Sequence, residues 1–320
     1  MMHAEVEKMN LRKVSIIGDG AVGSSIAFSL AGGHAVNEIV IVDLNHDKAE
    51  GDALDIADGM SLVSVPKIIR AGFYEDIKGS HIVIIAAGAA QKNGETRLDL
   101  LKKNASIVLD VAKKIKPHLD EGTLVLVVSN PVDLLTYIVA KELGLPHKQV
   151  FGSGTVLDTS RLKVALAKEA GVDPRSVHAF VVGEHGDSEV PLFSSASIGG
   201  LPLSLFLERE GKDPEVLKKI HEGVRDAAYE IIKKKGATYY AVALGVSRIV
   251  SAVLNDEASV LTVSSYMEDL YGVEGKIYLS LPAIVSGDGV EKVLLPVLSE
   301  EEKEALIGSV EALRSKLRQL

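Results

Sequence analysis

Three polar side chains in the second half of the sequence could together move a proton and hold an anion. His185 lies in the run GEHGD, and imidazole titrates near neutral pH, so it is a natural proton donor to a carbonyl oxygen. Asp158 and Arg161 are three residues apart, on neighbouring positions of one expected helix. Taken singly, a turn histidine and a surface ion pair are the more ordinary interpretations. The surrounding elements must therefore decide whether the three act together.

A glycine-rich loop near the N-terminus predicts a dinucleotide site. Gly18, Gly20 and Gly23 form G-x-G-x-x-G between an expected strand and an expected helix. They would permit a tight turn, a close approach of backbone to pyrophosphate, and close packing of the helix on the sheet. Asp43 ends the next strand and would accept hydrogen bonds from the adenosine ribose. Its charge should repel a 2′-phosphate, so the sequence favours NAD over NADP.

Two further strand ends and a polar loop should face the same crevice. Gly88 and Asn130 each follow an apolar strand, and ligands of open α/β sheets bind at the carboxyl ends of the strands. Asn130 could bond the nicotinamide ribose or the substrate, or serve only in a turn with Pro131, whose peptide bond could be cis. The polar stretch 91–97 ends in Arg97 and could act as a lid.

Strands and helices alternate up to about residue 150. This alternation, with two nearly continuous apolar strands, predicts a doubly wound parallel sheet of the Rossmann type, an α/β fold. We expect strands at 13–17, 38–42, 67–71, 81–86 and 123–128, and helices at 21–31, 47–58, 98–115 and 133–143.

The remainder of the chain has a mixed α+β pattern. The sequence predicts a NAD-binding domain at 1–150 packed closely against a catalytic, substrate-binding domain at 151–320. We expect helices at 155–170 and from Asp213-Pro214 to 235, strands at 177–182 and 190–198, hairpins within 258–297, and a last helix capped by Ser299 and Glu302.

Composition excludes several classes of function. The 320 residues include no cysteine, which excludes disulfides, thiol nucleophiles and cysteine-bound zinc, and we expect no metal site. With 35 basic and 44 acidic side chains the net charge is −9, so we expect neither nucleic acid nor an anionic membrane as partner. No apolar run reaches a membrane span, and the first ten residues lack the apolar stretch of a secretory signal; a cytoplasmic location is expected.

Five runs in order resemble the lactate and malate dehydrogenase family: GDGAVGSS, AAGAAQKNGETRLDL, VSNPVD, GSGTVLDTSRL and GEHGDSEVP. The resemblance covers nearly the whole chain from Lys13. It implies hydride transfer between NADH and a small 2-keto acid, with L stereochemistry. Members of the family are commonly homotetramers, so a homo-oligomer is implied as well.

The resemblance also implies a role for each polar residue. His185 would give and take the proton, and Asp158 would orient its imidazole. Arg161 would clamp the substrate carboxylate through two hydrogen bonds, and Arg97 would polarise the carbonyl. Two further substrate contacts are implied, by Asn130 and Thr238.

Gln91 is the residue that discriminates among substrates. Malate dehydrogenases that resemble this chain usually have an arginine here, which faces the second carboxylate of oxaloacetate. A neutral glutamine would leave that charge unpaired, and burying an unpaired carboxylate is costly. Pyruvate and L-lactate are therefore the expected pair, and Glu184 also resembles the lactate-specific members.

Some positions rest on the resemblance alone. Those that would touch NAD are Val22, Lys48, Tyr74 and Ser153. Many bacterial relatives are activated by fructose 1,6-bisphosphate, and the matching site is Lys163 and His178. Lysine replaces the usual arginine there. The replacement keeps the positive charge but loses the two-point hydrogen bond of a guanidinium, so the sequence does not decide whether the effector activates this protein.

Three alternatives stay open on the sequence. The first is the same chemistry on malate or another L-2-hydroxy acid. The second is a NAD-dependent glycoside hydrolase, although such enzymes use a metal site that commonly includes cysteine. The third is a NAD-binding protein without catalysis, against which the joint presence of His185, Asp158, Arg161 and Arg97 argues.

Overall fold

One eight-stranded sheet contains strands from both halves of the chain. The structure, a computed structural model, describes residues 12–89 and 97–319, and only the backbone of Arg97. The sheet order is β14-β13-β6-β5-β4-β1-β2-β3; the last six strands are parallel and the first two antiparallel. The strands are β1 Lys13–Ile17, β2 Glu38–Val42, β3 Ile68–Ala71, β4 Ile82–Ile85, β5 Leu124–Val127, β6 Val150–Gly152, β13 Ser264–Leu270 and β14 Val273–Ser280.

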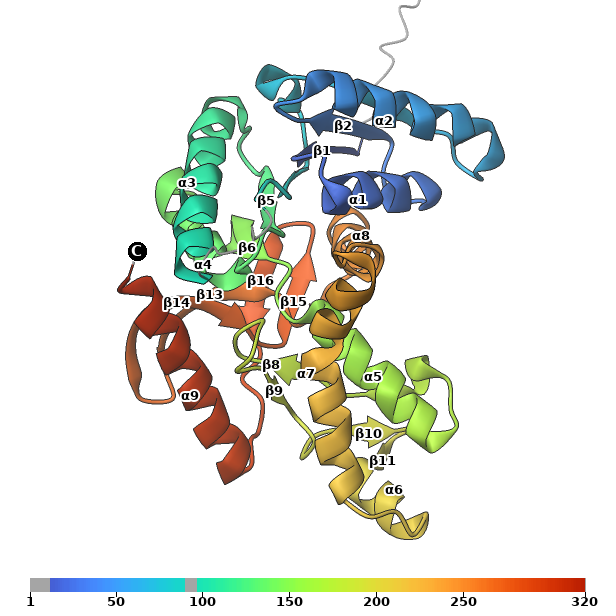
Figure 1. The fold of residues 1–320 in the computed structure, drawn as a ribbon, viewed down its shortest axis with the longest axis vertical. Helices are drawn as coiled ribbons and strands as arrows, with labels where there is room; N and C mark the ends of the chain where they lie inside the picture. The colour runs from blue at the N-terminus through green and yellow to red at the C-terminus, as the bar shows by residue number, and fades with distance from the viewer. Residues whose placement is uncertain (1–11, 90–96, 320) are drawn as a thin grey trace, which may run out of the picture.

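Helices cover both faces of this sheet, as the apolar strands require. Strands β1, β4 and β5 are buried along their whole length, which is typical of a parallel sheet sandwiched between helices. Helices α1 and α2 pack on one face, and α3 and α4 on the other (Figure 1). Their bounds are α1 Ala21–Gly32, α2 His46–Asp58, α3 Arg97–Ile115 and α4 Val132–Leu143. The predicted α/β Rossmann fold is confirmed.

The second half adds five helices within the described residues. They are α5 Val156–Ala170, α6 Leu203–Arg209, α7 Glu215–Lys235, α8 Tyr240–Leu254 and α9 Glu300–Leu317. The predicted capping box is confirmed, since Ser299 Oγ accepts from the Glu302 amide at 3.2 Å and Glu302 Oε2 accepts from the Ser299 amide at 2.9 Å. Helices α6 and α8 were not predicted from the sequence, and α8 packs directly against α1 (Figure 1).

The single strands predicted at 177–182 and 190–198 are wrong. His178 pairs with Ser197, whereas Val181 pairs with Pro191, so three extra residues lie on the second segment. A turn closed by the Ala196 amide on the carbonyl oxygen of Phe193 takes them up. The result is two small sheets, with β7 Val177–His178, β10 Ser197–Ile198 and β11 Leu201–Pro202 in one and β8 Val181–Val182 and β9 Val190–Pro191 in the other.

A third small sheet lies beside the large one. It contains β12 Ser259–Leu261, β15 Ala283–Ser286 and β16 Gly289–Val293, all antiparallel. Its buried residues join those of α1, α8 and the parallel strands in one apolar core, so the two halves share a continuous interior. Within residues 12–89 and 97–319, no helix is both long and apolar enough to cross a bilayer.

Candidate active site

The glycine loop has the shape that a dinucleotide site needs. Gly18 has a φ of +102°, and a Cβ added there would lie 2.5 Å from the amide nitrogen of Ala87. A Cβ on Gly23 would lie 1.8 Å from the carbonyl oxygen of Gly18, so both positions demand glycine. A Cβ on Gly20 would meet nothing within 4 Å. The loop is therefore packed tightly from behind and open at Gly20, where a pyrophosphate would approach.

The start of α1 offers backbone amides to an anion. Gly20 is its N-cap residue and provides no side-chain cap, so first-turn amides are left for a ligand. Asp43 supports the loop: Oδ2 accepts from the Asp19 amide at 2.6 Å and Oδ1 from the Asn45 amide at 2.8 Å. A carboxylate has about four lone-pair sites, so Asp43 can still accept from ribose hydroxyls. These residues fit NAD.

Lys48 lies beside this loop and pairs with Asp19. Its ammonium is 2.9 Å from Asp19 Oδ2 and 2.6 Å from Asp52 Oδ2. Burial raises the pKa of Asp19 to about 6, although Lys48 opposes the rise. Tyr74 opens a short 3-10 helix, Tyr74–Ile77, after β3, and burial raises its pKa. Val22 is half-buried and packs against the core.

His185, Asp158 and Arg161 form one connected group. Asp158 lies in the first turn of α5, and Arg161 lies one turn further along it. Asp158 Oδ2 is 2.6 Å from His185 Nδ1, and Asp158 Oδ1 accepts from Arg161 Nη1 at 2.8 Å. The Asp158 carboxylate is buried, and the side chains of Arg161 and His185 are 15% and 24% exposed. One buried carboxylate therefore holds both an imidazole and a guanidinium.

The electrostatics favour a protonated imidazole. Burial by itself lowers the pKa of His185, but the charge and hydrogen bond of Asp158 outweigh it and raise this pKa to about 9. Burial disfavours the Asp158 carboxylate, yet His185 and Arg161 hold the pKa of Asp158 below its usual value. At neutral pH the pair is thus an imidazolium beside a carboxylate, ready to give a proton.

Two buried side chains fix the backbone around His185. The His185 amide donates to Asp133 Oδ2 at 2.8 Å, and Ser264 Oγ donates to Asp133 Oδ1 at 2.5 Å. The Glu184 amide donates to Ser309 Oγ at 2.8 Å. The turn that carries His185 is therefore tied to α4, β13 and α9. The Glu184 carboxylate also bonds Lys316 of α9.

His185 opens on a small cavity of about 30 Å³ at the carboxyl ends of β5 and β6. Asn130 and Ser153 line it too, so the structure brings these three predicted residues together. The other lining residues come from the end of β5, the start of α5 and α8: Val128, Gly154, Val156, Leu157, Val242, Gly245 and Val246. The Asn130–Pro131 bond is cis.

Asn104 connects the cavity with the segment after β4. Its Oδ1 accepts from the Ala89 amide at 2.8 Å, and its Nδ2 donates to the carbonyl oxygen of Asn130 at 3.0 Å. Gly88 lies next to this amide, since a Cβ added there would be 3.6 Å from Asn104 Oδ1. Asn104 is buried and so holds two predicted positions in a fixed relation.

Four predicted substrate residues are not placed at the cavity. Arg161 is one of them: it is linked to His185 through Asp158 and is not among the lining residues. Gln91 and the side chain of Arg97 lie outside the described residues, and the backbone of Arg97 starts α3. Thr238 lies in the short link between α7 and α8 and is not among the lining residues. Lys163 and His178 line a separate cavity of about 550 Å³ together with Arg175 and Arg248.

Five residues that support the site were not predicted from the sequence: Asn104, Asp133, Glu189, Ser264 and Ser309. Burial raises the pKa of Glu189 to about 8, with the Asp158 charge adding to the rise. Glu189 Oε1 is buried and has no hydrogen-bond partner among the described residues. Asp133 and Glu189 lay within quoted runs, VSNPVD and GEHGDSEVP, as acidic residues beside apolar ones. An acidic residue beside apolar ones was the signal that could have found these two, whereas no such signal marks Asn104, Ser264 or Ser309.

Comparisons with known proteins agree with this geometry. Residues 12–152 match the NAD binding domain of lactate/malate dehydrogenase, and residues 155–320 match its alpha/beta C-terminal domain. The chain is 47% identical over 307 residues to L-lactate dehydrogenase 1 of Clostridium acetobutylicum, covering 95% of this chain and 97% of that one. It is 48% identical over 313 residues to L-lactate dehydrogenase of Thermoanaerobacter sp., covering 97% and 99%.

Solved structures show the same likeness. The ligand-bound form of minor L-lactate dehydrogenase from Enterococcus mundtii superposes with a TM-score of 0.94 at 41% identity, covering 97% of this chain and 99% of that one. Its unbound form gives a TM-score of 0.88 at the same identity, covering 96% and 97%.

Proposed function

The chain belongs to the lactate/malate dehydrogenase family, and from this premise we propose that it interconverts pyruvate and L-lactate with NAD as cofactor. One observation carries the proposal for the site. Asp158 holds both the proton-bearing His185 and the guanidinium of Arg161 from one buried position. This places an acid and an anion clamp side by side, which is what reduction of a keto acid needs.

His185 acts as general acid and base. In reduction its imidazolium gives the Nε2 proton to the carbonyl oxygen, and in oxidation the neutral ring accepts the hydroxyl proton. Asp158 accepts from Nδ1, which sets the tautomer and stabilises the charged ring. Hydride for C2 of the keto acid comes from the reduced nicotinamide. Asn130 and Ser153, which line the same cavity, are proposed to position cofactor and substrate.

Arg161 binds the substrate carboxylate. Its bond to Asp158 uses Nη1, and within the described chain Nη2 and Nε make no other hydrogen bond. Two donors on one edge of the guanidinium are thus available for a two-point grip. Arg97, at the start of α3, is proposed to polarise the carbonyl, and Thr238 to contact the methyl group; both roles rest on the family resemblance.

The cofactor residues are proposed on the same basis. Gly18, Gly20 and Gly23 shape the phosphate loop, and Asp43 selects NAD through the ribose. The residues proposed to contact NAD in addition are Val22, Lys48, Tyr74, Gly88, Asn130 and Ser153. A division into a NAD-binding domain at 1–150 and a catalytic domain at 151–320 stays part of the proposal.

Gln91 is proposed to make pyruvate the preferred substrate over oxaloacetate. The test is NADH oxidation with pyruvate, oxaloacetate and branched 2-keto acids, for the native chain and Gln91→Arg. We expect the native chain to prefer pyruvate and the variant to shift kcat/KM toward oxaloacetate by about tenfold or more, because the arginine pairs the second carboxylate. An unchanged ratio would contradict this specificity role, and no turnover of any keto acid would contradict the activity.

The surface supports a proposal about assembly. Phe28, Tyr240 and Leu244 are each about 70% exposed and line one hollow between α1 and α8. Exposed apolar side chains gathered in this way mark interaction surfaces. We propose that a second copy covers them within a homotetramer, which sedimentation would test against a monomer.

A regulatory role is proposed for the cavity beside His178. Lys163, Arg175 and Arg248 line it too, so it is suited to a doubly phosphorylated sugar. Fructose 1,6-bisphosphate is the proposed effector. Pyruvate kinetics with and without it decide: a lower KM supports activation, and unchanged kinetics contradict it.

A further inference from the structure

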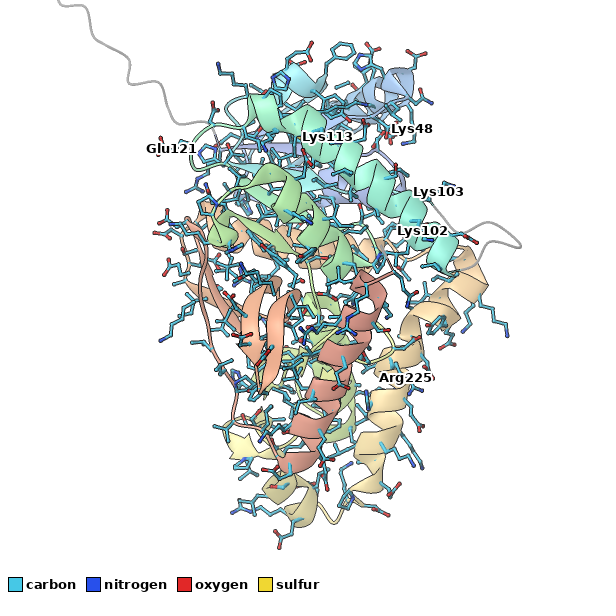
Figure 2. All side chains as sticks on the ribbon, turned by 90° about the vertical axis from the view of Figure 1, so that its left-hand side faces the viewer. Lys48, Lys102, Lys103, Lys113, Glu121 and Arg225 are labelled. Carbon is cyan, nitrogen blue, oxygen red and sulfur yellow. The ribbon has the colours of Figure 1, made fainter. Side chains whose placement is uncertain are left out.

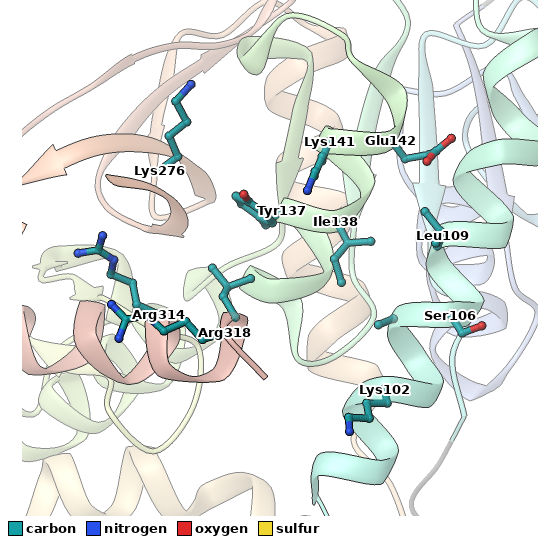
Figure 3. Close-up of a pocket in the computed structure, with 12 residues that line it drawn as sticks. Lys102, Ser106, Leu109, Tyr137, Ile138, Lys141, Glu142, Lys276, Arg314 and Arg318 are labelled. Atoms are coloured by element: carbon teal, nitrogen blue, oxygen red, sulfur yellow. The ribbon is translucent and has the colours of Figure 1, made fainter. Parts of the chain in front are cut away.

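A wide groove lies between α3, α4, β14 and α9, away from the cavity at His185. Its volume is about 860 Å³, within the range of sites that bind small organic molecules. The residues lining it include five basic side chains and one acidic one (Figure 3). The basic residues are Lys102, Lys141, Lys276, Arg314 and Arg318, and the acidic one is Glu142.

The positive charge of this groove contrasts with the negative net charge of the chain. The protein carries a net charge of −9, yet this groove concentrates basic groups from four separate elements. Over the described residues, none of the five forms an ion pair with a carboxylate, unlike Lys48, Lys114 or Lys234 elsewhere. Like charges brought together without partners repel one another, and a bound anion would remove that cost.

The basic groups surround an apolar floor. Tyr137 and Ile138 of α4 pack against the apolar residues between α3, α4 and the parallel sheet, and Ala105 and Leu109 of α3 form one wall. In Figure 3, Arg314 and Lys141 lie on either side of the Tyr137 ring. A ligand that fits must therefore carry both several negative charges and an apolar or aromatic part.

The arginine on α9 lies close to the backbone of β14. A Cβ added to Gly275 of β14 would lie 2.5 Å from Arg314 Nη2, so the guanidinium rests on the strand backbone at a glycine. Gly275 has a φ of +109°, a conformation that favours glycine. Arg314 also lines the groove, and its planar guanidinium suits phosphate oxygens.

We propose that the groove between α3, α4, β14 and α9 binds a polyphosphate ester that carries an aromatic base, a nucleoside triphosphate in size and charge. Arginine and lysine side chains would hold the phosphates, and Tyr137 and its apolar neighbours would contact the base. The proposal concerns binding and does not depend on turnover of pyruvate, so failure of the dehydrogenase assay would leave it unaffected.

Isothermal titration calorimetry tests this with the full chain saturated by NADH, so that the cofactor site is occupied. The probes are inorganic tripolyphosphate and guanosine triphosphate. We expect both to bind, the nucleotide more tightly. In Arg314→Gln/Arg318→Gln and in Lys141→Gln/Lys276→Gln, affinity should fall by about tenfold or more. Both lysines of the second pair are exposed, so this variant guards against misfolding of the first.

A matched control removes the same charge elsewhere. Lys113, at the far end of α3 from Lys102 (Figure 2), and Lys292 of β16 are exposed and lie outside the groove. Lys113→Gln/Lys292→Gln should bind both probes within twofold of the native chain. Lys163→Gln reports on the other basic cavity and should behave likewise. Equal affinity in the native chain and both groove variants, loss only in Lys163→Gln, or no gain from the base would overturn the proposal.

Discussion

The cofactor edge and the His185 site are built in opposite ways. At the cofactor edge, three glycines within six residues shape the loop, and backbone amides are proposed to bind the pyrophosphate. At the His185 site, side chains from α4, α5, β13 and α9 meet, and buried charged groups are proposed to carry out the reaction. The cofactor edge therefore depends on the absence of side chains, and the His185 site depends on how its side chains pair. Substitutions should therefore affect the two regions differently.

The largest expected effect is at His185. In His185→Asn, kcat for pyruvate reduction should fall by about 10²–10⁴-fold, the usual contribution of a positioned proton donor. The Kd for NADH should not change, because the glycine loop is untouched. Stopped-flow absorbance and NADH fluorescence measure the two quantities.

The control for this variant is His34→Asn, at an exposed position after α1. It should keep native kinetics. A loss of NADH affinity in His185→Asn equal to the loss in kcat would mean that the two regions are not separable.

A smaller effect is expected at the anion clamp. Arg161→Lys keeps the charge but loses the planar fork, so kcat/KM for pyruvate should fall by about 10–100-fold. Most of the loss should appear in KM if the carboxylate is held equally in ground and transition states. Steady-state kinetics at saturating NADH give the split. Native kcat/KM in Arg161→Lys would remove Arg161 from the substrate contacts.

The smallest effect on function is expected at the cofactor edge, where two glycine substitutions should have different consequences. A Cβ on Gly20 meets nothing, so Gly20→Ala should fold normally and weaken NADH binding by about tenfold by blocking the pyrophosphate. Gly23→Ala forces a clash with the Gly18 carbonyl and should instead lower the melting temperature. Fluorescence titration and thermal unfolding distinguish the two. Identical behaviour of both variants would argue against the proposed shape of the loop.

The same contrast explains what could be predicted from sequence. The glycine loop, Asp43 and the alternating elements follow from local spacing, and the structure confirms that part of the fold. Helix α8 was missed although Val242, Val246, Ile249 and Val253 repeat at helical spacing. It begins after Tyr239 without a side-chain cap, so the usual start signal is lacking.

The centre of the His185 site could be inferred only through the resemblance. Asp158 and His185 lie far apart in the sequence, and nothing local shows that they meet. The supporting hydrogen bonds are even harder to predict from sequence, because Ser264 and Asp133 are more than a hundred residues apart. The broken strands at 177–182 and 190–198 have the same cause: the turn at Phe193–Ala196 is set by tertiary pairing.

The charged pair also makes stability depend on pH. Folding raises the pKa of His185 from an ordinary value near 6.5 to about 9. The folded state therefore holds this proton more tightly than the unfolded state. The resulting contribution to the free energy of unfolding is fully present below about pH 6.5 and is lost as pH rises through about 9.

The pH profile of kcat/KM for pyruvate, in the native chain and in Asp158→Asn, tests most directly whether Asp158 keeps the proton on His185. At saturating NADH, the native profile should be flat near neutrality and fall above about pH 9. In Asp158→Asn the charge that raises this pKa most is lost, and burial is opposed only by the smaller effects of Asp133 and Glu189, so the fall should move down by two pH units or more. A fall at the same pH in both proteins would contradict the account.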